Sequence, residues 1–241
     1  ILLENNVGKG DIIAGYLLNH PDTIASFIAV NSLGAIWTCC SPDFGVESIV
    51  NRFSQLNPKV LLAHKNYKYN GKFFNQQEKI NELKEKLPSL KKTVLFDGNF
   101  ESWNLNSNYW IDFELKCVGF NDPIWILFSS GTTGKPKALT HGTGGILLEQ
   151  YKSHSLHQNI FKGDRFFWNT TTGWMMWNYA IGSFLCGATL CLYDGSANYP
   201  DISIQWKFAR DAQINHFGNG SPLFISSMKQ NIKEVNSKDL N

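Results

Sequence analysis

The stretch "WILFSSGTTGKPKALTHG", Trp125 to Gly142, starts as an apolar strand and then changes character. Eight of its residues are Gly, Ser or Thr, and most of these precede a Lys-Pro-Lys. Because glycine has no Cβ, backbone N–H groups and short hydroxyl side chains can converge there on an oxyanion. The two lysines add positive charge, and Pro136 restricts the chain between them. The stretch therefore predicts a phosphate-binding loop that follows a buried strand.

This loop differs from two common nucleotide-binding motifs. Gly131 has no second glycine five residues later, and no Ser or Thr follows Gly134 and Lys135, so the P-loop of simple NTPases is disfavoured. The dinucleotide pattern G-x-G-x-x-G is absent from the sequence as well. For an arbitrary Gly/Ser/Thr run, a solvated turn would be the plain alternative.

On both sides of the loop, apolar strand-like runs alternate with helical patterns. The predicted strands cover 35–40, 59–63, 93–97, 124–128, 165–169, 188–193 and 214–218. The first predicted helix runs from Lys9 or Asp11 to about Pro21, and the second covers 22–34, capped by Asp22 and ended by Gly34. Further helices are predicted over 46–56, 79–87, 174–184 and 202–211, and two more begin at 142 or 143 and at 221. Such alternation is typical of parallel strands joined by crossover helices. We expect an α/β fold with largely parallel sheets and helices on both faces.

The composition favours a packed globular protein and argues against nucleic acid as its main partner. The 241 residues are 43% hydrophobic and 14% aromatic with eight Trp, so much aromatic surface must be buried in a core or a lined pocket. The net charge is only +2, and the lysines gather in residues 79–92, a pattern that a solvated helix face explains. We therefore expect no nucleic-acid partner.

The spacing of cysteines and histidines bears on metal binding, and two uncharged stretches bear on membrane insertion. The five cysteines have no C-x-x-C spacing, and His154 and His157 lack a third ligand, so we predict no metal site, buried thiols and a reducing, cytoplasmic location. Residues 23–42 and 166–193 carry no charge and are long enough to cross a bilayer. Both contain polar residues and break into shorter helix and strand patterns, so we expect no stable membrane insertion.

The segment "SSGTTGKPK", Ser129 to Lys137, resembles the phosphate-binding signature of the adenylate-forming superfamily, with both glycines, both threonines and the Lys-Pro-Lys in register. Further segments at 31–61, 141–149, 163–195 and 217–224 resemble the acetoacetyl-CoA synthetase family, a branch close to acetyl-CoA synthetase. "TTTGWMMW", Thr170 to Trp177, is the piece most specific to this branch.

The resemblance implies an acid:CoA ligase that acts on small-molecule substrates and uses Mg·ATP and coenzyme A. In this family a carboxylate attacks the α-phosphate of ATP to give an acyl-adenylate and pyrophosphate, and the thiol of CoA then displaces AMP. Charge handling matters more in both steps than a protein nucleophile, so no catalytic side chain is expected in this chain. The residues expected to hold the ATP phosphates are Ser129, Ser130, Gly131, Thr132, Thr133, Gly134 and Lys137.

Two more sites follow from the resemblance. The acyl and adenylate pocket is expected to involve Trp174, Met175, Met176, Trp177, Gly218, Asn219, Gly220 and Ser221. Aromatic and Met side chains at helical spacing can equally be plain core, and Ser221 can be an ordinary helix cap. In "YNGK", Tyr69 to Lys72, Lys72 resembles a basic contact to the CoA nucleotide, although most single lysines are simply solvated.

Later elements of the family have no counterpart in these 241 residues, namely the Mg-binding threonine-glutamate turn, the ribose-binding aspartate, the hinge and the C-terminal catalytic lysine. We therefore expect residues 1–241 to be part of an N-terminal AMP-binding domain whose remainder, with the small C-terminal domain, is absent, and to be inactive alone. An acetyl- or propionyl-CoA synthetase-like ligase and a non-catalytic nucleotide-binding fragment remain alternatives. Oligomeric state is left open.

Overall fold

The computed structural model describes residues 1–98, 114–129, 134–230 and 232. The chain divides into two compact units. The first unit comprises Ile1–Tyr67 and Asn75–Ile146, and the second comprises Lys68–Phe74 and Leu147–Asn241.

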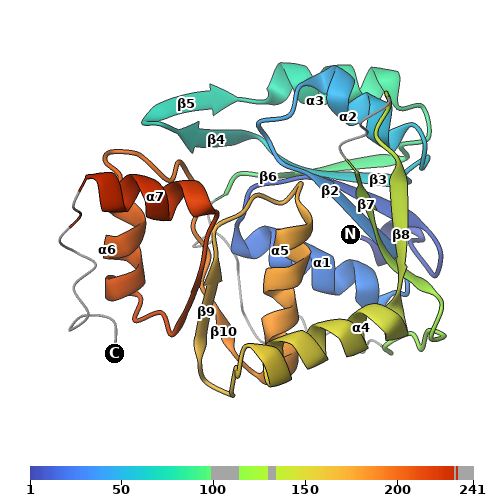
Figure 1. Cartoon of the computed structure of the whole chain (residues 1–241). Coiled ribbons are helices and arrows are strands. Elements are labelled where there is room, and N and C mark those ends of the chain that lie inside the picture. Colours follow the sequence, from blue (N-terminus) through green and yellow to red (C-terminus); the bar gives the residue numbers. More distant parts are fainter. Residues whose placement is uncertain (99–113, 130–133, 231, 233–241) are drawn as a thin grey trace, which may run out of the picture. The chain divides into compact units, whose positions relative to one another are not determined.

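The first unit is built on a six-stranded sheet with the order β6-β3-β1-β2-β7-β8 (Figure 1). Its strands are β1 (Ile12–Tyr16), β2 (Ile36–Cys40), β3 (Val60–His64), β6 (Lys92–Phe96), β7 (Pro123–Phe128) and β8 (Ala138–Gly142). All neighbouring strands are parallel except β7 and β8, which are antiparallel. The short connection between β7 and β8 leaves no room for a crossover helix, so the chain returns antiparallel at this edge. The expected largely parallel α/β fold is confirmed.

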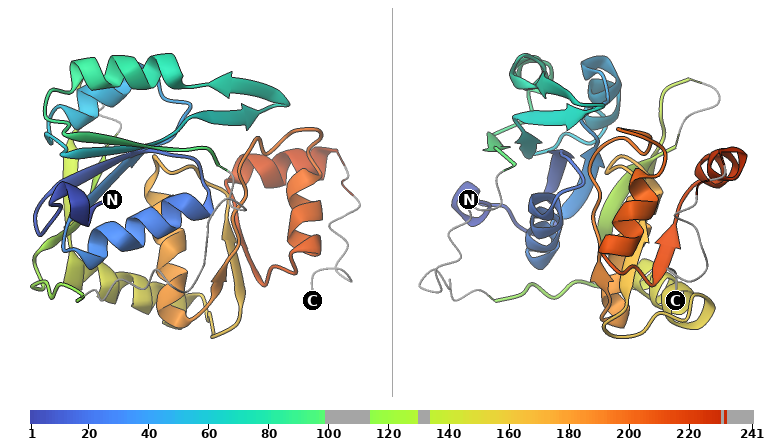
Figure 2. Two further views of the ribbon diagram at one scale, coloured as in Figure 1. Left: turned by 180° about the vertical axis from the view of Figure 1, so that it is seen from behind. Right: turned by 90° about the vertical axis from the view of Figure 1, so that its left-hand side faces the viewer.

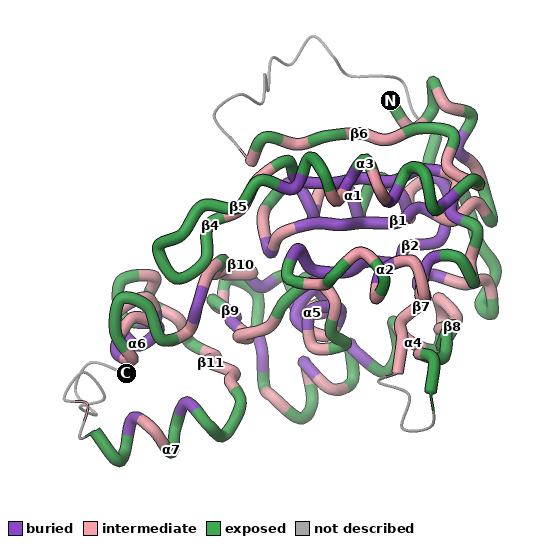
Figure 3. Tube along the Cα trace, turned by 90° about the horizontal axis from the view of Figure 1, so that it is seen from above, coloured by how far each residue is buried: buried purple, intermediate pink, exposed green. Residues whose placement is uncertain are grey.

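Helices cover both faces of this sheet (Figure 2). On one face lie α2 (Val46–Phe53) and α3 (Gln77–Lys86), whose buried Phe53 and Leu83 pack with Tyr16 of β1 in one hydrophobic cluster. On the other face lies α1 (Pro21–Ser32), where Phe27 meets Trp37 of β2 at 5.9 Å between ring centroids. Strands β1 and β2 are consequently buried almost completely, as the purple segments of Figure 3 show.

The helix predicted from Lys9 or Asp11 to Pro21 is wrong, because Ile12–Tyr16 form the central strand β1. A strand covered on both faces is apolar throughout, so its pattern loses the two-residue period that distinguishes it from a helix. Gly15 supports this packing, since a Cβ there would lie 2.8 Å from Cys39 Sγ on the neighbouring strand. The predicted cap of α1 is also wrong: His20 is the N-cap, and its Nδ1 accepts the N–H of Asp22 at 3.3 Å.

A β-hairpin absent from our sequence prediction joins β3 to α3. Its strands are β4 (Asn66–Tyr69) and β5 (Lys72–Asn75), and the turn between them is Asn70-Gly71. Both turn residues have left-handed backbone angles, with φ of 50° at Asn70 and 71° at Gly71. An Asn-Gly pair in this conformation is the favoured two-residue hairpin turn.

The second unit holds a small parallel sheet with the order β10-β9-β11. Phe166 of β9 packs with Ala180 in one cluster, whereas Phe167 contacts Phe208 at 5.3 Å between ring centroids, so successive side chains serve opposite faces. The strands are β9 (Arg165–Trp168), β10 (Thr189–Leu190) and β11 (His216–Gly218), and β10 is shorter than predicted. The helices are α4 (Thr143–Lys152, which starts in the first unit), η4 (Ser153–His157), α5 (Met175–Ile181), η5 (Gly182–Cys186), α6 (Ile204–Asp211) and α7 (Ser221–Lys229), while η1 (Leu3–Asn5) opens the first unit.

Among the described residues, no helix combines the length and the apolar character that a membrane crossing requires. The uncharged stretch 23–42 runs through most of α1 and then β2, and 166–193 runs through β9, α5, η5 and β10. Both stretches are thus divided between helix and strand, as their patterns predicted.

Candidate active site

The predicted phosphate loop leaves the carboxyl end of β7 and returns as β8. The N–H of Ser129 donates to the carbonyl of Lys137 at 3.0 Å and closes the base of the loop. Gly134 has a φ of 140°, which side-chain-bearing residues rarely adopt. Residues 130–133, which hold the predicted Ser130, Gly131, Thr132 and Thr133, lie outside the described residues. Carboxyl ends of strands are where open α/β sheets bind ligands, so this location suits the predicted role.

Residues of α2 and just after it contact both ends of the loop. Gln55 Nε2 donates to the carbonyl of Pro136 at 3.0 Å. Arg52 lies 6.0 Å from the centre of the Phe128 ring at the end of β7, and its guanidinium also donates to the Ser48 carbonyl at 2.8 Å. Lys137 is exposed, and it forms no ion pair within the part of the chain that the structure describes. Its ammonium group is therefore available to an anion.

In the second unit, the predicted turn at Gly218–Ser221 connects β11 to α7. Gly220 is the N-cap of α7, so the alternative interpretation of Ser221 as the cap is wrong. Asn219 accepts the N–H of Gly220 at 2.8 Å through its own Oδ1. The turn borders a cavity of about 360 Å³ lined by Asn169, Ala197, Asn198, Asn219, Gly220, Pro222, Leu223 and Ser226.

The motif Thr170–Trp177 divides into an exposed and a buried part. Trp174 is 60% exposed and Met175 43% exposed, and Met176 is partly buried. Trp177 is only 1% exposed and ranks among the largest fully buried side chains. These four residues do not line the 360 Å³ cavity beside Asn219. Trp177 has the surroundings of a core residue, and the pocket role of Trp174–Met176 stays a prediction.

Lys72 stands exposed at the start of β5, directly after the hairpin turn. The turn is held closely against Tyr199 in the same unit, because a Cβ on Gly71 would lie 2.3 Å from the Tyr199 hydroxyl oxygen. Glycine is thus required at the turn both by its backbone angle and by this contact. The proposed contact of Lys72 with CoA stays a prediction.

Comparison with known proteins relates these sites to a family. The family model described as "AMP-binding enzyme" matches residues 1–241, the whole chain. The chain belongs to this family. Acetoacetyl-CoA synthetase of Mus musculus is 35% identical over 97% of this chain and 38% of its own length. Acetoacetyl-coenzyme A synthetase of Rhizobium meliloti (strain 1021) is 35% identical over 99% of the chain and 39% of its own length.

A solved structure agrees with these relatives of the AMP-binding enzyme family. Acetoacetyl-CoA synthetase from Streptomyces lividans superimposes with a TM-score of 0.92 and 36% identity, covering 99% of this chain and 38% of that protein. The fold is therefore that of the corresponding part of an AMP-binding enzyme. The chain spans about two fifths of the length of the relatives it matches.

Two histidines of the chain have packing partners. His141 Nδ1 accepts the indole N–H of Trp125 at 2.7 Å across the β7–β8 pair. His154 is fully buried, its Nδ1 lies 2.8 Å from the Gln150 carbonyl, and its ring stacks on Tyr179 at 4.3 Å. Burial lowers the pKa of His154, so its ring is neutral near pH 7. Both side chains therefore act in packing.

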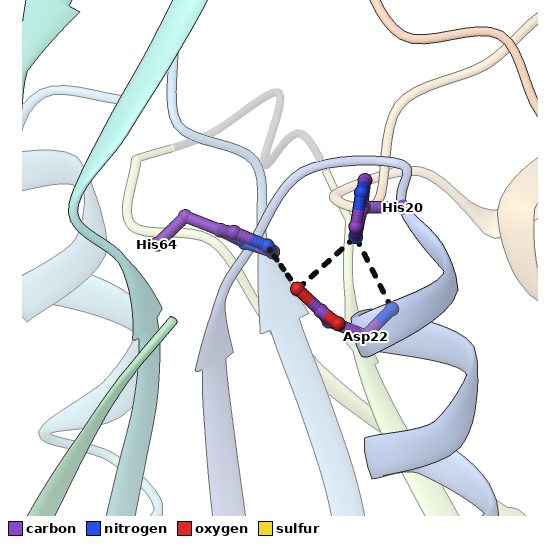
Figure 4. A group of neighbouring side chains, drawn as sticks. All are labelled: His20, Asp22 and His64. Atoms are coloured by element: carbon purple, nitrogen blue, oxygen red, sulfur yellow. Dashed lines mark hydrogen bonds and ion pairs between the residues drawn. The ribbon is translucent and has the colours of Figure 1, made fainter. Parts of the chain in front are cut away.

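A polar cluster in the first unit was missed by the sequence analysis (Figure 4). Asp22 Oδ2 lies 3.1 Å from His20 Nδ1 and 3.3 Å from His64 Nε2. Both Asp22 and His64 are almost inaccessible to solvent, and His20 is 21% exposed. The sequence shows only the pair His20 and Asp22 around Pro21. His64 joins them because β3 lies beside β1, which leads into α1.

The ligand spacing of this cluster resembles a metal site, but the hydrogen bonds point to another role. The three candidate ligand atoms all lie within 4.8 Å of one another. His64 Nδ1 accepts the N–H of Leu18 at 3.2 Å, so the proton of the neutral ring is on Nε2, which faces Asp22. A metal ion would need the lone pair at that nitrogen. We interpret the cluster as a buried hydrogen-bonded anchor between β3 and the start of α1.

Proposed function

We propose that this chain is part of an ATP-dependent acid:CoA ligase that converts acetoacetate, ATP and CoA into acetoacetyl-CoA, AMP and diphosphate through an acyl-adenylate. The observation that carries this proposal is the 35% identity to acetoacetyl-CoA synthetases of a mammal and a bacterium over nearly the whole chain. The location of the Ser129–Lys137 loop at the carboxyl end of β7 supports the nucleotide-binding part of the proposal.

The chain's contribution to the first step is charge stabilisation. Negative charge builds on the ATP phosphates as the carboxylate attacks, and Mg²⁺ enters with ATP as part of that substrate. In our proposal the β- and γ-phosphates are held by Ser129, Ser130, Gly131, Thr132, Thr133 and Gly134, with Lys137 offsetting charge. Lys137 is exposed and forms no ion pair with any residue that the structure describes, and this, with the closed base of the loop, supports the assignment. Preorganised donors of this kind act where charge develops in the transition state.

The acyl and CoA groups would be handled by other residues. We assign the acyl-adenylate pocket to Trp174, Met175, Met176 and the turn Gly218–Ser221, and a CoA phosphate contact to Lys72. Trp177 is buried and packs in the core. The cavity beside Asn219 and Gly220 supports the turn's assignment. The exposed location of Lys72 on the hairpin leaves its ammonium group open to a phosphate.

We further propose that residues 1–241 form part of the N-terminal domain of a longer cytoplasmic enzyme. The relatives it matches are about two and a half times as long, since the chain covers 38% of the mouse protein. The adenylating lysine expected from the family resemblance is not among these residues. The separate 241-residue chain should therefore release pyrophosphate at a negligible rate.

The test is the intact mass of the natural polypeptide, followed by pyrophosphate release with ATP, Mg²⁺ and acetoacetate, with and without CoA. A mass well above 27.3 kDa with acetoacetate-dependent release would support the proposal. Acetate and propionate serve as matched substrates, and faster release with either would transfer the proposal to an acetyl- or propionyl-CoA synthetase. A mass near 27.3 kDa with no release would refute catalysis by this protein and leave a nucleotide-binding role.

A further inference from the structure

Three side-chain amides from three elements meet beside the 360 Å³ cavity of the second unit. Asn219 Oδ1 accepts the N–H of Gly220 at 2.8 Å and Asn169 Nδ2 at 3.3 Å. Asn219 Nδ2 donates to Gln205 Oε1 at 2.5 Å. Asn169 follows β9, Asn219 follows β11, and Gln205 belongs to α6. The network therefore ties both strand ends to a helix.

These contacts fix the orientation of the Asn219 amide. The backbone N–H of Gly220 can only donate, so it must face Oδ1, and Nδ2 is then directed towards α6. An amide nitrogen at that place needs an acceptor, which Gln205 Oε1 supplies. A flipped Gln205 would set two NH₂ groups against each other. The Gln205 side chain thus fixes the orientation of the Asn219 amide plane through this hydrogen bond.

Gln205 keeps this contact at a cost to stability. The residue is fully buried, and its Nε2 has no hydrogen-bond partner among the described residues. A Leu or Met at this position would fill similar space without a buried donor left unpaired. Because Gln205 does not line the cavity, its Oε1 serves Asn219 and not a ligand directly.

The lining of the cavity fits a short acid that carries one polar group on an apolar chain. Asn169, Asn198 and Asn219 bring side-chain amides, and Ser226 brings a hydroxyl. Leu223 and Pro222 supply apolar surface. A keto oxygen accepts hydrogen bonds from amide N–H groups, whereas a methylene in its place leaves those donors unpaired. The cavity therefore offers a means to tell a 3-keto acid from its saturated analogue.

We propose that Gln205 is a positioning residue for substrate selectivity: it holds Asn219, whose Oδ1 fixes the Asn169 amide, so that the second N–H of Asn169 donates to the 3-keto oxygen of the acid. This inference rests on the proposed function, because it takes acetoacetate as the ligand. Gln205 lies outside the cavity and acts through residues that line it.

The experiment compares acetoacetate with butyrate, which lacks the keto oxygen, in pyrophosphate release by the natural full-length protein. Gln205→Met removes the acceptor at nearly constant size. We expect the preference for acetoacetate, measured as the ratio of kcat/KM values, to fall about tenfold through KM. Gln205→Glu keeps an Oε acceptor and should recover part of the preference. Equal losses for both acids, or an unchanged ratio, would overturn the selectivity role.

Gln150→Met is the matched control, because Gln150 is also buried in the second unit and its Nε2 donates to the Asn178 carbonyl at 3.1 Å, away from this network. It should alter stability and leave the ratio unchanged. Hydrogen exchange of the Gly220 amide gives a readout without catalysis: exchange should be faster in Gln205→Met and unchanged in Gln150→Met. Unaltered exchange in Gln205→Met would refute the positioning role. If the unmodified full-length protein releases no pyrophosphate in response to acetoacetate, the proposed function itself is refuted, independently of the role of Gln205.

Discussion

Acidification from pH 7.5 to 5 should destabilise the first unit through His64. The ring of His64 is fully buried between the Leu18 N–H on one side and Asp22 on the other. Burial lowers the pKa of His64 from 6.5 to about 4, although hydrogen bonding and attraction to Asp22 act in the opposite direction. His20 also faces the ring and lowers its pKa, and Asp97 raises it. A second proton on His64 would have to displace the Leu18 hydrogen bond.

The sign and size of the effect follow from the two pKa values. Well above pH 6.5 the ring is neutral in both the folded and the unfolded chain, and the full stability is present. Between pH 6.5 and about 4, His64 is protonated in the unfolded chain but still neutral in the folded chain. The free energy of unfolding therefore decreases as the pH is lowered through this range. At about 1.4 kcal/mol per pKa unit, the loss reaches about 2 kcal/mol at pH 5 and about 3 kcal/mol near pH 4.

Urea unfolding of the protein and of His64→Gln at pH 7.5, 6 and 5 measures this loss. Glutamine retains an N–H donor for Asp22 but does not titrate. From pH 7.5 to 5, the unfolding free energy of His64→Gln should therefore decrease by about 2 kcal/mol less than that of the unmodified protein. Carboxylates and histidines outside the His20–Asp22–His64 cluster and Asp97 titrate equally in both proteins and cancel in the comparison. His157→Gln, at an exposed histidine, should behave as the unmodified protein. Parallel pH dependences for the protein and His64→Gln would show that His64 is not the destabilising group.

Three further outcomes are expected. Lys137→Ala should lower pyrophosphate release roughly 10²-fold without a change in Tm, because the side chain is exposed; an activity within a factor of two would remove it from the phosphate site. Gly71→Ala should cost about 1–3 kcal/mol in urea unfolding because of its φ and its contact with Tyr199, and Tyr199→Ala in the same chain should recover only the steric part. Trp177→Ala should cost about 3–5 kcal/mol, whereas Trp174→Ala should leave thermal stability nearly unchanged and alter acid selectivity; similar stability losses would contradict the division between a buried and an exposed tryptophan.

Local chemistry explains which elements could be predicted from the sequence. Helix α2 starts at Val46 and β7 ends before the Gly/Ser/Thr loop, where amphipathic spacing and turn residues mark the boundaries. Gly34, with a φ of 67°, ends α1 as its position suggested. The segment Ile12–Tyr16 could not be assigned in this way, because burial on both faces leaves no period that separates a central strand from a buried helix.

The hairpin and the His20–Asp22–His64 cluster were missed for different physical reasons. The hairpin did have a local signal, since Asn70-Gly71 between two short runs is a strong turn pattern. The cluster had none that a single segment could show. His64 is distant in the sequence from Asp22, and only the pairing of β3 with β1 brings its ring to the start of α1.

The same distinction separates the two predicted binding sites. A phosphate loop is built from consecutive residues, so "SSGTTGKPK" carries its chemistry in the sequence itself. The amide network depends on the register of β9 against β11, in which Trp168 pairs with Gly218 and the N–H of Asn169 donates to the Gly218 carbonyl at 2.8 Å. A shift of one residue would turn the Asn169 side chain to the opposite face of the sheet and separate it from Asn219. Selectivity for the acid should therefore be sensitive to substitutions that disturb this strand pair, even where they do not line the cavity.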